Sequence, residues 1–160
     1  RGSVIPFFQN ITKSPKQPFP VTDKKMTRFN ITLDQSINAV LFAIKNQQGG
    51  EVFVPKLFSY RVVDICKALD KSRKLKFIGI RPGEKVHEEM ITVHDGLNTI
   101  DAGKFYIIMP SNSLQQKKIL NFFKKNFKAK KMNNNFSYNS GNNNRFLSNE
   151  VLKKLIAQQC

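Results

Sequence analysis

The turn Arg81-Pro82-Gly83-Glu84 constrains the fold of this chain more than any other sequence feature. Leu75 and Phe77 alternate with lysines in the preceding residues, which predicts a half-buried strand over residues 74–80. A helix is predicted over residues 84–90, and the Pro-Gly pair between the two elements favours a sharp bend. A strand that leads through a turn into a helix is typical of α/β folds, in which ligands bind beyond the carboxyl ends of strands.

The side chains of this turn predict an anion site. The Arg81 guanidinium can grip phosphate oxygens in fork geometry, and Glu84 can accept hydrogen bonds from sugar hydroxyls. The two groups together suit a nucleotide diphosphate. The alternative is an ordinary surface turn that opens a helix, with Glu84 favoured near the positive N-terminal end of that helix.

Helix and strand signals alternate along the rest of the chain, which favours a single α/β unit over residues 1–160. Thr32 and Gln35 match a capping box, and the helix that they open stops before Gly49. One face of this helix carries Leu33, Ile37, Val40, Leu41 and Ile44. Ser59 is the predicted cap of a helix over residues 62–69. The other expected elements are a helix from Ser3 to Phe8, an extended piece at 19–22, strands at 51–55 and 104–109, an Asn-rich turn region at 133–144 and a helix at 152–157.

The composition is that of a globular protein with few cysteines. Hydrophobic residues make up 40% of the 160 residues and include 14 phenylalanines, which argues against disorder. Two cysteines are too few for a disulfide framework, so we expect a cytoplasmic protein with Cys66 as a small core residue. No apolar run approaches the roughly 18 residues of a membrane span. The two histidines and two cysteines have no metal-ligand spacing, and no metal is expected.

The net charge of +16 is the main argument for a different function. Seven lysines and no acid lie within residues 117–131, interleaved with phenylalanines, as in proteins that bind nucleic acids or anionic surfaces. A solvated helix with Ile119, Leu120, Phe123 and Phe127 turned to the core has the same pattern, and lysine and asparagine are abundant along the whole chain. We therefore expect no nucleic-acid binding and interpret Lys117–Met132 as a variable basic segment.

Several segments resemble one enzyme family in their order along the chain. They are Arg1–Phe8, Pro20–Asp23, Met26–Phe29, Gly49–Lys56, Ile80–Lys85 and Tyr138–Asn144. Together they resemble the C-terminal half of the inverting UDP-N-acetylglucosamine 4,6-dehydratases. These are extended short-chain dehydrogenase/reductases that initiate pseudaminic acid and capsular polysaccharide pathways. The resemblance covers nearly the whole chain and is weakest between Ser111 and Met132. One departure is Asn30, where the family usually has tryptophan.

This resemblance implies that the chain is the substrate-binding C-terminal part of an extended short-chain dehydrogenase/reductase, lacking most of the Rossmann half. Neither a glycine-rich dinucleotide loop nor a Tyr-x-x-x-Lys pair occurs in the sequence, since Tyr60, Tyr106 and Tyr138 are not followed by lysine at that spacing. We therefore expect a truncated piece without catalytic residues and without activity of its own. By resemblance, the full enzyme is a homo-oligomer and binds NADP mainly through the missing half.

The resemblance assigns binding roles to residues near the N-terminus and in the central turn. It implies that Arg81 and Glu84 contact the UDP moiety and that Val4 lies beside the bound sugar. Thr22 is implied to lie near the nucleotide, with a turn threonine bonded to its own backbone as the alternative. Arg1 is implied to lie beside the cofactor.

The C-terminal turn Gly141-Asn142-Asn143-Asn144 is also implied to contact the nucleotide, with a low-complexity run as the alternative. Arg28 is either a second basic group at the pyrophosphate or, as we prefer, a structural partner of Asp23 or Asp34.

We accordingly expect the chain to bind UDP-N-acetylglucosamine or a related UDP-sugar, as part of an NADP-dependent, C5-inverting 4,6-dehydratase. Two alternatives remain open. One is another nucleotide-sugar epimerase or dehydratase of the same superfamily. The other is a non-enzymatic basic module that binds nucleic acid.

Overall fold

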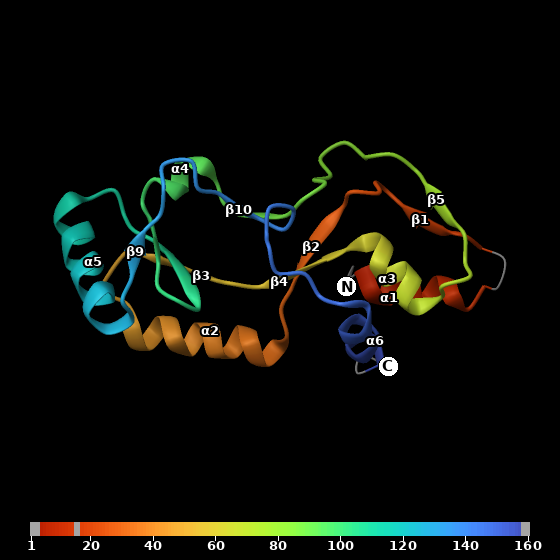
Figure 1. Cartoon of the computed structure of the whole chain (residues 1–160), viewed down its shortest axis with the longest axis horizontal. Helices are drawn as coiled ribbons and strands as arrows, with labels where there is room; N and C mark the ends of the chain where they lie inside the picture. Colours follow the sequence, from red (N-terminus) through yellow and green to blue (C-terminus); the bar gives the residue numbers. More distant parts are fainter. Residues whose placement is uncertain (1–3, 15–16, 158–160) are drawn as a thin grey trace. The chain divides into compact units, whose positions relative to one another are not determined.

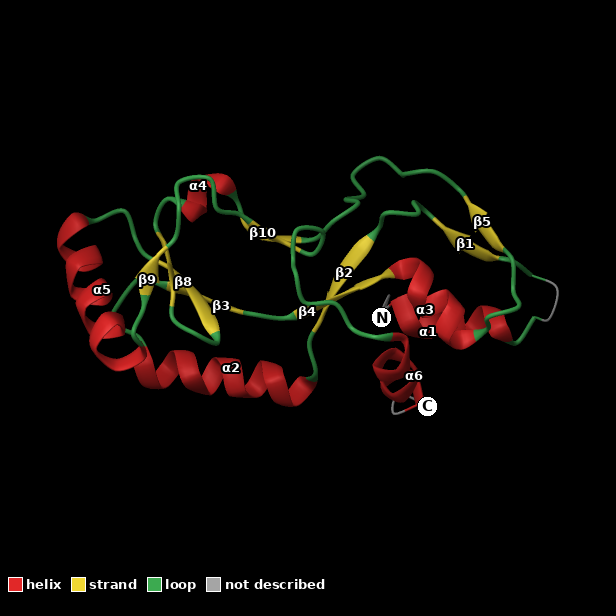
Figure 2. Cartoon of the chain, viewed as in Figure 1, coloured by secondary structure: helices red, strands yellow, loops and turns green. Residues whose placement is uncertain are grey.

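The computed structural model describes residues 4–14 and 17–157, which form a mixed α/β fold as predicted (Figures 1 and 2). The chain divides into two compact units. Unit 1 comprises residues 1–30, 58–88 and 140–160, and unit 2 comprises residues 31–57 and 89–139. The sequence indicated no internal boundary. The reason is that the units are interleaved along the chain, so no single linker separates them.

The described residues of unit 1 form three helices and two pairs of strands. Its elements are α1 (Val4–Thr12), β1 (Phe19–Val21), β2 (Thr27–Asn30), β4 (Phe58–Arg61), α3 (Val62–Leu69), β5 (Leu75–Phe77) and α6 (Asn149–Ala157). Strand β1 pairs with β5 in parallel, and β2 pairs with β4 antiparallel. Helix α3 packs against both α1 and α6, and Phe19, Ile65 and Cys66 are fully buried in the core of this unit. Cys66 is thus a core residue, as predicted.

Two predictions in unit 1 concern the ends of helices. The predicted N-terminal helix continues beyond Phe8 to Thr12, while Ser3 lies outside the described residues. The prediction that Ser59 caps the helix over residues 62–69 is wrong, because Arg61 is the N-cap of α3 and makes no side-chain capping bond. Ser59 instead lies in β4, fully buried, and its backbone N–H donates to the Arg145 carbonyl at 2.7 Å.

Unit 2 is built around a four-stranded antiparallel sheet with the order β3-β8-β7-β9. Its elements are α2 (Leu33–Asn46), β3 (Val52–Pro55), β6 (Glu89–Ile91), α4 (Val93–Gly96), β7 (Thr99–Asp101), β8 (Phe105–Ile108), α5 (Ser113–Phe127), β9 (Lys130–Lys131) and β10 (Tyr138–Asn139). Ile100 and Ile107 of the sheet are buried with Ile119 and Phe123 of α5. The core-facing stripe predicted for the basic helix is therefore confirmed.

Helix α2 has the predicted capping box but exposes the predicted apolar face. The Gln35 N–H donates to Thr32 Oγ1 at 3.2 Å, and the Thr32 N–H donates to Gln35 Oε1 at 2.9 Å. The five apolar side chains of that face are between 48% and 76% exposed. Contact with the sheet instead comes from Phe42, whose ring stacks on Phe105 with centroids 4.3 Å apart.

The prediction of a helix over residues 84–90 is wrong. Residues 84–88 are irregular and lead into strand β6. Their backbone groups bond to other segments, since Val86 O accepts from the Thr27 N–H at 3.0 Å and Glu88 O accepts from the Ser140 N–H at 2.7 Å. These long-range bonds satisfy the peptide groups that a helix would have paired internally.

Candidate functional site

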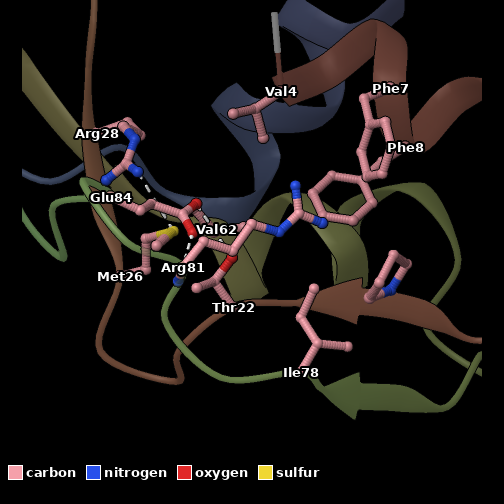
Figure 3. A pocket seen from close by; sticks show the side chains of 11 residues that line it. Val4, Phe7, Phe8, Thr22, Met26, Arg28, Val62, Ile78, Arg81 and Glu84 are labelled. Carbon is pink, nitrogen blue, oxygen red and sulfur yellow. Dashed lines mark hydrogen bonds between the residues drawn. The ribbon is translucent and has the colours of Figure 1, made fainter. Parts of the chain in front are cut away.

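A cavity of about 280 Å³ lies in unit 1 (Figure 3). It is lined by Val4, Phe7, Phe8, Pro20, Thr22, Met26, Arg28, Val62, Ile78, Arg81 and Glu84. Apolar walls with a few convergent polar groups are the usual composition of a small-molecule site. The cavity brings together Val4, Thr22, Arg81 and Glu84, which the sequence had marked as substrate-binding residues.

The parallel pairing of β1 and β5 creates the polar side of this cavity. Phe19 is paired with Leu75 and Val21 with Phe77, so both strands end at the same edge. Thr22 follows the end of β1 directly, and Arg81 follows the end of β5 by four residues. The cavity therefore lies beyond the carboxyl ends of a parallel strand pair, where ligands bind in open α/β folds.

Glu84 organises the turn through both oxygens of its carboxylate. Thr22 Oγ1 donates to Glu84 Oε1 at 3.2 Å, and the Arg81 N–H donates to Glu84 Oε2 at 3.4 Å. The Glu84 N–H in turn donates to the Arg81 carbonyl at 3.0 Å, and Gly83 supplies the positive φ of 80° that the turn requires. An ionised carboxylate oxygen has two lone pairs, so each oxygen can accept a further hydrogen bond.

The Arg81 side chain reaches from this turn into the cavity, toward Phe7 and Phe8 of α1 (Figure 3). Among residues 4–14 and 17–157, no carboxylate forms an ion pair with its guanidinium. Its N–H groups are therefore available to an anion that enters the cavity.

Arg28 lines the same cavity but is held by the protein. Its Nη1 donates to the carbonyls of Thr27 at 2.7 Å and Val86 at 3.1 Å, and its Nε lies 3.7 Å from Glu88 Oε1. The preferred structural role is confirmed, whereas the expected partners Asp23 and Asp34 are wrong. Glu88 is brought to Arg28 by the irregular segment 84–88, for which the sequence predicted a helix.

The turn Gly141-Asn142-Asn143-Asn144 does not line this cavity. Asn143 is buried, and its Nδ2 donates to Ser59 Oγ at 2.9 Å while its Oδ1 accepts from the Arg145 N–H at 3.2 Å. Its amide group is thus used within unit 1. Nucleotide contact by this turn stays a prediction, as does the role of Arg1, which lies outside the described residues.

Apart from Val4, the sequence did not mark the apolar side chains that line the cavity. Phe7 and Phe8 are in edge-to-face contact with centroids 5.2 Å apart, and Phe7 is 51% exposed. A signal was available, because Ile5, Phe8 and Ile11 form the buried stripe of α1 at helical spacing. Phe7 falls outside this stripe, which marks it as an aromatic side chain that the core does not bury.

Two other features are absent from the described part of the chain. It contains no cluster of three histidine, cysteine or acidic side chains suited to a metal ion. None of its helices combines the length and the apolar character of a membrane span.

Comparisons with known proteins agree with the resemblance found in the sequence. The model of a family described as "Polysaccharide biosynthesis protein" matches residues 1–110. The chain is 38% identical over 159 residues to UDP-N-acetylglucosamine 4,6-dehydratase (inverting) of Campylobacter jejuni serotype O:2, with 98% of this chain and 47% of that protein covered. It is also 38% identical over 112 residues to UDP-glucose 4-epimerase of Rickettsia canadensis, with 68% of this chain and 33% of that protein covered.

The fold has a close counterpart among solved structures. The X-ray structure of Pen from Bacillus thuringiensis matches with a TM-score of 0.74 and 31% identity, over 99% of this chain and 46% of that one. The chain thus spans about half the length of the dehydratase and of Pen. The predicted similarity to part of a longer enzyme of this family is confirmed.

Proposed function

The chain belongs to the polysaccharide biosynthesis protein family, and on that basis we propose that the cavity of unit 1 binds the UDP moiety of a UDP-sugar. One observation carries the proposal. The Arg81 guanidinium, without an ion pair among the described residues, shares the cavity with Glu84, whose carboxylate retains free lone pairs. A diphosphate and a ribose hydroxyl are the complementary partners of these two groups.

In this proposal, the polar and the apolar sides of the cavity bind different parts of the ligand. Arg81 donates two parallel N–H bonds to the diphosphate, and Glu84 accepts from a ribose hydroxyl. The exposed ring of Phe7 offers an apolar surface to a ring of the ligand. Since about 280 Å³ is small for a whole nucleotide sugar, the cavity takes the diphosphate and an adjoining ring and leaves the rest outside.

The reaction of the whole protein is a further proposal. We propose a C5-inverting UDP-N-acetylglucosamine 4,6-dehydratase, a lyase of surface polysaccharide or pseudaminic acid biosynthesis, that works as a cytoplasmic homo-oligomer. The 38% identity to the Campylobacter enzyme supports it. In such an enzyme the UDP moiety lies away from the reacting carbons, and its binding energy serves to orient the sugar.

NADP is the cofactor proposed for the whole protein, where it would accept and return a hydride. The chain has no glycine-rich dinucleotide loop, and Arg1, the residue expected beside the cofactor, lies outside the described residues. We therefore propose that this chain binds the UDP moiety and that the catalytic and cofactor residues lie elsewhere. The chain alone is then inactive.

A UDP-sugar epimerase is the second candidate, because the sequence identity to a UDP-glucose 4-epimerase is also 38%, over 112 residues instead of 159. Binding of the UDP moiety is common to both candidates. Only the product formed from UDP-N-acetylglucosamine by the whole protein separates them, a 4-keto-6-deoxy sugar in one case and a 4-epimer in the other.

The binding proposal is tested by titrating the chain with UDP, UMP, uridine and a single-stranded oligonucleotide in a calorimeter. We expect UDP to bind at least about tenfold more tightly than uridine, because Arg81 acts on the phosphates. Equal affinity for UDP and uridine would contradict the role of the diphosphate. Binding of the oligonucleotide in preference to UDP, with steep salt dependence, would favour a basic nucleic-acid-binding module.

A further inference from the structure

We infer that Ser140 and Gly141 are positioning residues, which fix the Arg81–Glu84 turn by holding His87 and Glu88. This inference deepens the proposed function of the cavity and rests on it. It gives the C-terminal turn, which does not line the cavity, an indirect part in ligand binding.

Ser140 and Glu88 are joined by two hydrogen bonds in opposite directions. The Glu88 N–H donates to Ser140 Oγ at 2.9 Å, and the Ser140 N–H donates to the Glu88 carbonyl at 2.7 Å. Ser140 is fully buried, so the loss of either bond leaves a polar group without water to replace the partner. The backbone at residue 88 is therefore fixed by residue 140.

The hydroxyl of Ser140 continues into a chain that ends at His87. Ser140 Oγ lies 2.7 Å from Thr27 Oγ1, which lies 2.7 Å from His87 Nδ1. The Glu88 N–H can only donate to Ser140 Oγ, whereas each hydroxyl can both donate and accept. All three contacts therefore form together with either tautomer of His87. The side chain of His87 is thereby tied to β2 and to residue 140.

Gly141 allows the His87 ring to lie against the backbone. A Cβ atom at position 141 would lie 2.6 Å from both Cγ and Nδ1 of His87, a distance at which the ring must move. The backbone of Gly141 does not have the positive φ that favours glycine. Contact with the His87 ring is therefore the reason for glycine at this position.

The Arg81–Glu84 turn is anchored on both sides. On one side lies the strand pair β1–β5, and on the other the cluster formed by His87, Glu88, Ser140 and Gly141. On the downstream side, Val86 O accepts from the Thr27 N–H at 3.0 Å, only two residues beyond Glu84. On the upstream side, the Ile78 N–H donates to the Val21 carbonyl at 3.0 Å. Pro82 and Gly83 lie between these anchors and are exposed, so little packing holds the turn itself in place. A shift of residues 86–88 would therefore move Glu84 relative to Thr22.

The first test measures UDP affinity by calorimetry for variants that displace the His87 ring or remove the hydroxyl that bonds to it. Gly141→Ala and Thr27→Val should each weaken UDP binding by roughly tenfold, because both displace His87. Thr27→Ser keeps the hydroxyl and should stay within about threefold of the parent. Equal affinities for Thr27→Val and Thr27→Ser would overturn the inference.

A double-mutant cycle distinguishes positioning from direct contact. If Gly141 acts through the turn, Gly141→Ala should lose most of its effect on UDP binding once Arg81 is replaced by alanine. An undiminished effect in the Arg81→Ala background would overturn the inference, since it would mean that Gly141 acts on the ligand by another route.

A readout without ligand separates this inference from the proposed function. Hydrogen exchange of the Glu84 and Thr27 amides, which bond to Arg81 O and Val86 O, should accelerate at least about tenfold in Gly141→Ala and in Thr27→Val. Unchanged exchange at both amides would overturn the inference even if UDP binds. Accelerated exchange in a chain that does not bind UDP would support the positioning role and contradict the function proposed for the cavity.

Discussion

The hydroxyl of Thr22 donates a 3.2 Å hydrogen bond to Glu84 Oε1 and so joins the segments that follow two parallel strands. The bond orients the carboxylate before any ligand arrives. It also rules out the alternative that Thr22 merely bonds to its own backbone. The polar side of the cavity is therefore formed by residues 62 positions apart in the sequence.

Removal of this bond should affect ligand binding more than folding. Thr22→Val replaces the hydroxyl with a methyl group of similar size, so Glu84 loses a donor and gains freedom to rotate. We expect UDP affinity to fall by roughly three- to tenfold, as is usual for one neutral-to-charged hydrogen bond in a partly exposed site. Thr22→Ser is the matched control and should bind UDP like the parent. Calorimetric titration of both variants decides, and a loss in Thr22→Ser equal to that in Thr22→Val would contradict this role of the hydroxyl.

Arg73 should be a principal stabilising residue of unit 1. Its side chain is 9% exposed, pairs with Asp70 at 3.0 Å and donates to the carbonyls of Ile11, Thr12, Ser14 and Gln17. Arg73→Ala removes the ion pair and all of these hydrogen bonds, although the Ile11 and Ser14 carbonyls keep backbone donors, and should lower the free energy of unfolding by about 2–4 kcal/mol. Arg73→Lys should recover little, because an ammonium group cannot reach the same set of acceptors.

Urea denaturation measures both variants, with Lys71→Ala as the control at an exposed position in the same loop. If Arg73→Ala unfolds at the same urea concentration as Lys71→Ala, the network around Arg73 does not stabilise the fold.

Adjacent residues of helix α2 should respond differently to substitution. Leu41 is 58% exposed, so Leu41→Gln should change the free energy of unfolding by less than about 0.5 kcal/mol. Phe42 stacks on Phe105, and Phe42→Ala should cost about 2–3 kcal/mol through lost packing. Denaturation of the two variants at equal protein concentration checks the contrast. A similar loss in Leu41→Gln would mean that the apolar face of α2 is covered in solution.

Cys66 should remain protonated at alkaline pH while the chain is folded. Burial raises the pKa of its thiol from the ordinary value of 9.0 to about 12. At pH 8 we expect iodoacetamide to modify Cys66 only as fast as unfolding exposes it, which peptide mass spectrometry can follow. Rapid modification of Cys66 in the native chain would contradict its burial.

The same pKa difference sets the sign of a pH effect on stability. Above pH 9 the unfolded chain loses the thiol proton while the folded chain retains it, so the unfolded state is favoured increasingly up to about pH 12. The free energy of unfolding should therefore fall less steeply with pH in Cys66→Ala than in the parent. Identical slopes between pH 9 and 11 would show that Cys66 does not contribute.

Local patterns in the sequence predicted local structure well. The Thr32–Gln35 capping box and the Ile119–Phe123 stripe depend on spacings of three or four residues, and both are confirmed. The cavity residues Thr22, Arg81 and Glu84 were marked individually through a family resemblance. That they lie together depends on the pairing of β1 with β5, which no local pattern reveals.

The wrong predictions share one physical cause. A helix was expected over residues 84–90, with Ser59 as the cap of another. Instead, residues 84–88 and Ser59 are held by hydrogen bonds to distant segments, around residues 140 and 145. The partner of Arg28 was missed for the same reason. Where backbone groups bond across the fold, propensity and spacing along the chain do not decide the outcome.

The central claim is that the Arg81 guanidinium binds the diphosphate of UDP in the cavity. It is tested most directly by titrating UDP into Arg81→Ala and Lys85→Ala variants of the chain. Lys85 is an exposed cation of the same segment that does not line the cavity, so it controls for the loss of one positive charge. A bidentate guanidinium–phosphate contact contributes roughly 2–4 kcal/mol, so Arg81→Ala should bind UDP about 30- to 1,000-fold more weakly. Lys85→Ala should stay within about threefold of the parent, and Arg81→Lys should recover only part of the loss. If Arg81→Ala binds UDP as tightly as Lys85→Ala does, Arg81 is a surface turn residue and the nucleotide binds elsewhere.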